Sequence, residues 1–137
     1  ILESMKENQV RSYSTLTKLI NPTILNSSGK SGEKLGSYEE IMQNDSVEPT
    51  FRDLALILWG YDNLSRSQPS KIATKLSRLN DSSSPWRHSA REIIALTEKR
   101  TGNIKKARSI FKGLIDDVTT PNGIRSRASE ILSLMKN

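Results

Sequence analysis

The sequence predicts an all-α fold, a solenoid of about three helical hairpins closed by a C-terminal capping helix. Two observations lead to this prediction. The pattern D-x-x-x-P occurs three times with a spacing of 36 residues, beginning at Asp45, Asp81 and Asp117. Between these occurrences the apolar residues are spaced by three and four, as on one face of an amphipathic helix. A fixed period of this length is typical of stacked helical units that bury their apolar faces against their neighbours.

The repeated pattern is expected to mark a boundary between helices. Proline fixes its own torsion and lacks an amide proton, so it suits the first turn of a helix and disrupts later turns. Ser84 and Thr120 directly precede two of the prolines, where their hydroxyls are suited to accept hydrogen bonds from the free amides of that turn. Glu48 is a poorer cap before the first proline. Each occurrence should therefore end one hairpin and begin the next.

The first two units are expected over residues 1–44 and 49–80. In the first unit, Pro22 ends or kinks an initial helix, and a loop rich in Ser and Gly covers residues 26–36 before a second helix. In the second unit, a turn over residues 65–69 separates a helix with a broad apolar stripe from another amphipathic helix. A stripe of that width suits a helix that is buried on two sides.

The third unit, residues 85–117, and a capping helix over residues 121–136 complete a single domain. Gly102 and Asn103 separate the two helices of this unit. Glycine permits the left-handed conformation that closes a helix, and asparagine is suited to cap the next one. The last helix has no partner in the sequence, as expected for an element that covers the open end of a solenoid.

The third unit resembles a tetratricopeptide repeat. In that family the helix junction reads Gly then Asp or Asn, followed by a small residue, an aromatic residue and a proline at set spacings. The matching positions are Gly102, Asn103, Ala107 and Phe111, with Pro121 two residues later than the usual spacing. The first unit matches less well, and the second departs furthest. The resemblance implies a tetratricopeptide-like α-solenoid.

A second resemblance depends on short elements between Tyr13 and the C-terminus. They are Tyr38-Glu-Glu-Ile41, Phe51-Arg-Asp-Leu-Ala55, Pro85-Trp-Arg87, Gly102, Ala107-Arg108, Phe111 and Arg125-Ser-Arg-Ala128. Together they are similar to the C-terminal domain of a bacterial family related to the YfgM-type ancillary subunit of the Sec translocon. This resemblance implies an N-terminal membrane helix, a helical-repeat domain on the periplasmic side of the inner membrane, and contacts with translocon or envelope proteins.

The start of the chain bears on its location. It begins Ile-Leu-Glu without methionine, so we expect a fragment that lacks an upstream membrane anchor. The longest apolar run, residues 54–60, is too short to cross a bilayer. The family resemblance favours the periplasmic face of the inner membrane, and the cytoplasm is the alternative.

The charge of the chain is unevenly distributed. Residues 1–63 carry 6 Lys and Arg against 9 Asp and Glu, whereas residues 64–137 carry 15 against 6. The basic half could attract an acidic protein, anionic lipid or nucleic acid, or it could simply form a solvated helical face. Nucleic-acid binding is the alternative function, with its cations on one helix: Lys105, Lys106, Arg108 and Lys112.

The sequence contains little that suggests catalysis. Without cysteine, and with His88 as the single histidine, it shows no metal-ligand spacing and no catalytic triad. We expect His88 to face solvent in the first turn of its helix. Carboxylates that are adjacent in sequence point in different directions on a helix and do not make an acid–base pair. A non-enzymatic protein without cofactor, metal or small-molecule substrate is therefore expected.

Seven residues are candidates for contacting a partner protein: Tyr61, Trp86, Arg87, Arg91, Glu92, Lys99 and Arg100. Those on the first helices of the hairpins should be exposed along a concave groove. For Trp86 and Arg87 a structural role is the competing interpretation, in which Trp86 packs one hairpin onto the next and Arg87 bonds carbonyls at the end of the preceding helix. The expected function is an adaptor or chaperone-like scaffold. Self-association through the first helix is a further alternative.

The basic residues after the last boundary have the same structural interpretation. Arg125 and Arg127 are close in sequence to Asp116 and Asp117. We expect them to tie the capping helix to this boundary rather than to meet a partner.

Overall fold

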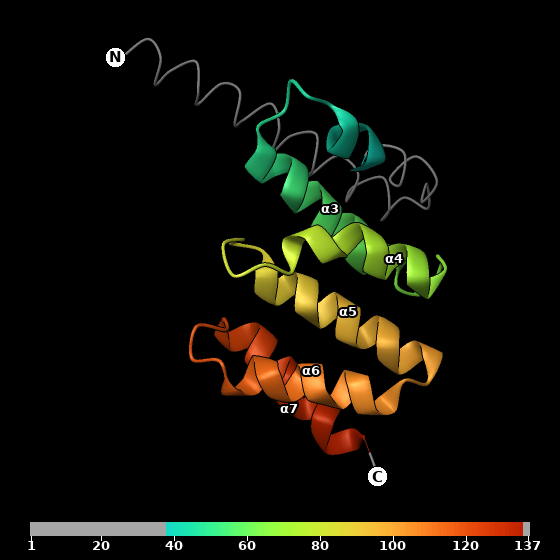
Figure 1. The fold of residues 1–137 in the computed structure, drawn as a ribbon, viewed down its shortest axis with the longest axis vertical. Coiled ribbons are helices and arrows are strands. Elements are labelled where there is room, and N and C mark those ends of the chain that lie inside the picture. The colour runs from blue at the N-terminus through green and yellow to red at the C-terminus, as the bar shows by residue number, and fades with distance from the viewer. Residues whose placement is uncertain (1–37, 136–137) are drawn as a thin grey trace, which may run out of the picture. The chain divides into compact units, whose positions relative to one another are not determined.

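The computed structural model describes residues 38–135, and Figure 1 shows them as helices joined by short loops. No strand occurs among these residues, which confirms the all-α class. Residues 38–43 are helical and are followed by α3 (Pro49–Asn63), α4 (Pro69–Leu76), the 3-10 turn η1 (Ser77–Leu79), α5 (Arg87–Thr101), α6 (Ile104–Asp116) and α7 (Asn122–Leu134). The initial helix before Pro22 and the loop over residues 26–36 lie outside the described residues.

The chain divides into two compact units, Ile1–Trp59 and Gly60–Asn137, and the division falls within α3. In the second unit each helix packs against the next one along the chain, from α4 to α7. Helix α7 also contacts α5, so each of α5, α6 and α7 contacts the other two.

One core cluster of the second unit forms where α5, α6 and α7 meet. Its buried members are Ala95, Ala107, Phe111, Leu114, Ile124 and Ala128. Phe111 is completely buried, and alanines allow the helix backbones to approach closely around it. The small and aromatic positions expected from the repeat pattern are therefore both core positions.

The junction between α5 and α6 closes as expected at its glycine. Gly102 has a φ of 90°, the left-handed conformation that ends a helix. The amides of Gly102 and Asn103 donate to the carbonyls of Lys99 and Glu98 at 3.1 and 2.9 Å. The expected cap by Asn103 is wrong, because its Nδ2 donates to Glu98 Oε2 at 2.7 Å instead of serving α6.

The D-x-x-x-P pattern produces a specific turn at its aspartate. Asp81 Oδ1 accepts from the amide and the hydroxyl of Ser83 at 2.9 and 2.8 Å. Asp117 Oδ1 accepts from the amide and hydroxyl of Thr119 at 2.9 and 2.6 Å. In both turns the amide three residues after the aspartate donates to its carbonyl. Such side-chain bonds to the local backbone stabilise a turn where a helix stops.

At the first boundary the same turn forms one residue earlier. Asn44 Oδ1 accepts from the amide of Ser46 at 2.9 Å, and Asn44 O accepts from the amide of Val47 at 3.0 Å. Asp45 lies outside this arrangement and pairs with Arg52 at 3.5 Å. The 36-residue spacing therefore identifies real boundaries, although Asn44 replaces Asp45 in the turn.

The helices begin less regularly than the prolines suggest. Helix α3 begins at Pro49, but α5 begins at Arg87 and α7 at Asn122. The expected cap by Ser84 holds only in part, because its hydroxyl accepts at 3.1 Å from the amide of Trp86, which directly precedes the first residue of α5. The expected cap by Thr120 is wrong: its hydroxyl is buried and has no hydrogen-bond partner among the described residues, since the side chain lies in the interior.

Candidate functional site

The seven candidate residues do not form one site. Glu92 and Tyr61 belong to a polar network in the second unit, and Arg87 and Arg91 belong to the last boundary. Arg100 binds backbone carbonyls, and Lys99 lines a surface cavity.

The polar network is centred on Glu92. Its Oε1 accepts from Tyr61 Oη at 3.0 Å and from Arg127 Nε at 3.2 Å. The expected exposure of Glu92 is wrong, because the residue is 2% exposed. Arg127 also departs from expectation, since it reaches Glu92 rather than Asp116 or Asp117. A buried carboxylate requires such partners, and here they come from the end of α3 and from α7.

The network and the burial of Tyr61 make its hydroxyl harder to ionise. Burial, the charge of Glu92 and the hydrogen bond to it raise the pKa of Tyr61 to about 12. The same carboxylate raises the pKa of Arg127 through its hydrogen bond. The side chain of Arg127 is 54% exposed, so this network borders solvent on one side. The network joins α5 to α7 and to the last turn of α3, which belongs to the second unit.

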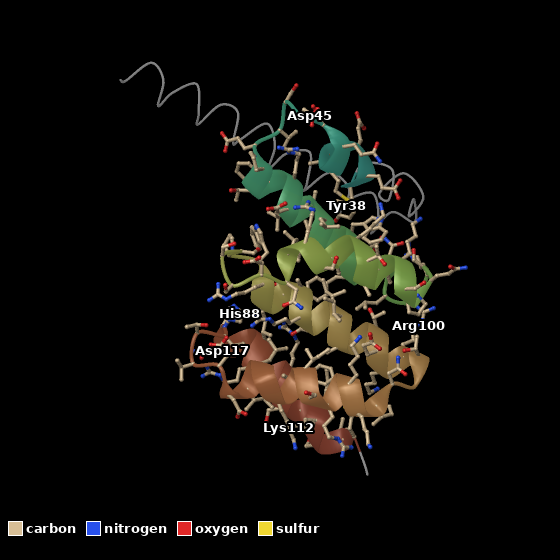
Figure 2. The ribbon with its side chains drawn as sticks, viewed as in Figure 1. Tyr38, Asp45, His88, Arg100, Lys112 and Asp117 are labelled. Atoms are coloured by element: carbon tan, nitrogen blue, oxygen red, sulfur yellow. The ribbon has the colours of Figure 1, made fainter. Side chains whose placement is uncertain are left out.

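The last boundary contains the single histidine. His88 Nε2 lies 3.3 Å from Asp117 Oδ2 and 3.1 Å from Thr119 Oγ1, and Figure 2 shows His88 beside Asp117. The expected solvent-facing position is wrong, because the loop between α6 and α7 covers the ring and leaves it 6% exposed. The hydroxyl and amide of Thr119, with a smaller contribution from His88, lower the pKa of Asp117 to about 2.

Arginines reinforce this boundary. Arg87 Nη1 donates to Ser84 O at 3.0 Å, and its Nη2 donates to Thr119 Oγ1 at 3.2 Å. The expected bond from Arg87 to carbonyls at the end of the preceding helix is therefore wrong, because Ser84 lies in the loop that follows that helix. Arg91 Nε donates to Asn80 Oδ1 at 2.8 Å. Its Nη1 also lies 3.8 Å from Asp117 Oδ2.

The structural interpretation also holds for Arg125, whereas for Trp86 it stays a prediction. Arg125 Nη2 donates to Asp117 O at 2.9 Å and to Thr120 O at 3.3 Å. Trp86 is half-buried, and its Nε1 has no hydrogen-bond partner among the described residues.

Arg100 connects the end of α5 to the loop between α3 and α4. Its Nη1 donates to Ser67 O at 3.0 Å and also to Leu64 O, and Figure 2 places it at the end of α5. Its guanidinium is exposed, yet its donors are used within the chain. Lys99 differs from it, since Lys99 forms no ion pair with any described residue.

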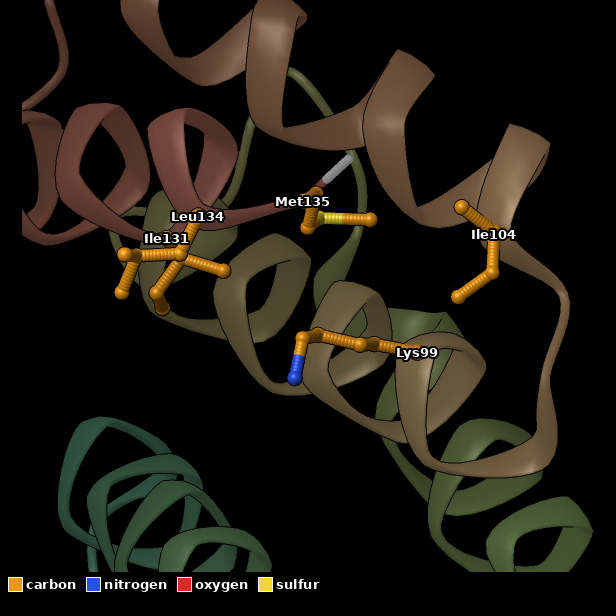
Figure 3. Close-up of a pocket in the computed structure, with 5 residues that line it drawn as sticks. All are labelled: Lys99, Ile104, Ile131, Leu134 and Met135. Carbon is orange, nitrogen blue, oxygen red and sulfur yellow. The ribbon is translucent and has the colours of Figure 1, made fainter. Parts of the chain in front are cut away.

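The cavity at Lys99 was not expected from the sequence. It measures about 260 Å³ and is lined by Lys99, Ile104, Ile131, Leu134 and Met135 (Figure 3). A second cavity of about 260 Å³ is lined by Asn80, Arg91, Ile94, Ile110 and Gly113. The sequence signal for the first is the place of Leu134, three residues after Ile131, at the edge of the apolar stripe that runs through Ile124, Ala128 and Ile131.

Two further features concern residues 38–135. No cluster of three or more side chains suited to hold a metal ion is found within that range. None of its helices combines the length and hydropathy needed to span a bilayer.

The chain was also compared with known proteins. No family model matches it, and neither the curated proteins nor the solved structures include a match.

Proposed function

We propose that this chain is a tetratricopeptide-like helical-repeat module that binds other proteins. The observation that carries the proposal is the recurrence of one boundary turn at Asn44, Asp81 and Asp117. Helical units that repeat in this way bury their apolar faces against each other and offer extended surfaces to partners. On the basis of the sequence resemblance to the YfgM-type family, the proposed location of the module is the periplasmic face of the bacterial inner membrane.

The chemistry of the polar groups supports a non-enzymatic role. Glu92 and Asp117 both bind side chains from other helices or loops, and His88 is buried between such groups. Groups that carry acid–base catalysis must reach a substrate. These three groups instead join elements of the second unit, as a scaffold requires.

Nucleic-acid binding receives less support. Of the four cations expected to bind phosphates, Lys106 Nζ lies 2.9 Å from Glu98 Oε1, and Arg108 Nη2 donates to Met135 O at 3.0 Å. Both are thus already engaged within the chain. Lys105 and Lys112 are exposed, and two phosphate contacts would give only weak binding with a shallow dependence on salt.

Capture from bacterial membranes tests the proposed function. The chain, carrying a photo-crosslinking group on its surface, is used as bait, and secretion or envelope proteins should be recovered by mass spectrometry. A bait with Phe111→Asp is the control, because a charge in the core should abolish the folded surface. Recovery of the same proteins by both baits, or of no envelope protein by the intact chain, would refute the proposal.

A further inference from the structure

Exposed apolar side chains gather at one place in the second unit. Among residues 38–135 the exposed large apolar side chains are Ile104 at 38%, Val118 at 89% and Leu134 at 74%. Ile104 and Leu134 both line the cavity beside Lys99. Scattered apolar residues on a surface are ordinary, whereas apolar residues gathered around a hollow indicate an interaction site.

Three helices build this hollow, which we call the C-terminal groove and define by its lining, Lys99, Ile104, Ile131, Leu134 and Met135. Lys99 comes from the end of α5, Ile104 from the start of α6, and the remaining residues from the end of α7 (Figure 3). Ile131 and Met135 pack against the core on their inner side, so the groove has a firm floor. Its volume of about 260 Å³ is just below the range of about 300–1,000 Å³ for small-molecule pockets, and it suits the side chains of a docked segment.

The rim of the groove is positively charged. Lys99 belongs to the lining, is exposed and has no described ion-pair partner. The nearby carboxylate of Glu98 is already bound by Lys106 Nζ at 2.9 Å and by Asn103 Nδ2 at 2.7 Å. The groove therefore presents an apolar floor beside a cation that is available to an incoming carboxylate.

We propose that the C-terminal groove binds an amphipathic segment of another protein in which aliphatic residues stand beside carboxylates. The aliphatic side chains would fill the cavity, and a carboxylate would pair with Lys99. This inference rests on the proposed protein-binding function and specifies the chemistry of the partner. Apolar anchors with flanking charges are a common way for a groove to recognise a helix.

A second copy of this chain is a poorer occupant. In a two-fold contact the same surface meets itself, so one interface would contain the Lys99 of both copies and no described carboxylate of the groove lining to pair with either. The unit Gly60–Asn137 also carries 15 Lys and Arg against 7 Asp and Glu, so two copies would repel each other. Charge complementarity therefore favours an acidic partner.

The test uses two synthetic helical peptides of about 15 residues, a length at which helices become marginally stable in water. One places Leu at spacings of three and four with Glu at its flanks, and the other carries Lys in place of Glu. Methyl NMR of the intact chain should show shifts at Ile104, Ile131, Leu134 and Met135 with the Glu peptide. That peptide should bind at least about tenfold more tightly than the Lys peptide, and less tightly as salt is added.

Matched variants locate the binding site. Leu134→Glu and Lys99→Glu should each weaken binding of the Glu peptide by about tenfold, because they remove an anchor or reverse the charge of the rim. Val118→Glu and Lys112→Glu make the same chemical changes at exposed positions outside the groove and should leave the affinity within about twofold. Circular dichroism should show all four variants folded, since each position is exposed.

Several outcomes would overturn the inference. They are absence of binding by the Glu peptide, equal binding of both peptides, or equal losses in groove and control variants. Dimerisation that disappears in Leu134→Glu, measured by sedimentation, would assign the groove to a second copy. Binding to vesicles of anionic lipid that disappears in the same variant would assign it to a membrane surface. If membrane proteins are captured equally well by the intact chain and by Leu134→Glu, the groove proposal fails while the proposed function stands.

Discussion

Asp81 and Asp117 occupy equivalent places in the repeated pattern, but they differ in what they contact beyond their own turn. Both accept bonds from the amide and hydroxyl two residues later. Asp117 also lies 3.3 Å from His88 Nε2 in α5. We infer that Asp81 shapes a turn, whereas Asp117 shapes a turn and holds two elements together.

Acid denaturation should distinguish these two aspartates. The pKa of Asp117 is lowered from 3.8 to about 2, so its contribution to stability is present above the unfolded value and lost as pH falls through the folded one. Asp117→Asn should lower the free energy of unfolding at neutral pH and reduce the loss of stability between about pH 4 and 2. Urea unfolding across this range measures both effects.

Asp81→Asn is the matched control for that experiment. The hydrogen bonds from Ser83 also lower the pKa of Asp81, so a loss in the same direction is expected. It should be smaller, because the described contacts of Asp81 stay within its own turn. Equal losses in the two variants would show that the contact with His88 adds nothing to stability.

At the scale of the helices, two glycines illustrate different requirements of the backbone. Gly102 ends α5 with a φ of 90°, a backbone conformation that residues with a Cβ rarely adopt. Gly113 lies within α6, and a Cβ added there meets nothing within 4 Å. The first glycine is needed to turn the chain, whereas the second lowers the stability of its own helix.

Alanine substitution tests this difference. Gly113→Ala should raise the free energy of unfolding by about 0.5–1 kcal/mol, because it reduces the entropy lost on folding without a clash. Gly102→Ala should lower it by about 1–2 kcal/mol, the cost of a left-handed residue with a side chain. Chemical denaturation of both variants gives the values. A loss of stability in Gly113→Ala would contradict this prediction, because it would show that α6 does not accept a side chain at this position.

At the scale of the molecule, the second unit separates apolar residues that form its core from those that remain available. Phe111 is fully buried between α5, α6 and α7, whereas Leu134 is 74% exposed at the end of α7. Both are large apolar side chains on helices of the same unit. The packing of the helices buries Phe111, which stabilises the fold, and leaves Leu134 exposed and available for binding.

Truncation of these two side chains should confirm that separation. Phe111→Ala should destabilise the chain by about 3–5 kcal/mol, because it removes buried area and leaves a cavity. Leu134→Ala should change stability by no more than about 0.5 kcal/mol, as expected for an exposed residue. Thermal or urea unfolding measures both. A large loss for Leu134→Ala would place this side chain in the core and contradict its assignment to the groove.

Most features that depend on neighbours along the chain could be predicted from the sequence, although the side-chain caps by Asn103 and Thr120 could not. The helices of the described region, the closure at Gly102 and the core positions Ala107 and Phe111 follow from apolar spacing and from the conformational freedom of glycine. The boundary turns follow from short polar side chains that bond the backbone two residues away. Such effects act over a few residues, so the sequence contains nearly all of the information.

The roles of the polar residues could not be predicted from their neighbours along the chain. Hydropathy places Glu92 and His88 on the surface, but the partners that allow their burial lie about 30 residues away in other elements. Desolvation of a charge costs several kcal/mol unless a partner compensates it, so burial depends on which helices meet. The sequence by itself determined the helices, the approximate places where one hairpin ends and the next begins, and the apolar core positions. The tertiary structure decided which polar groups are used internally and where an apolar groove beside Lys99 remains open, because both depend on contacts between segments far apart along the chain.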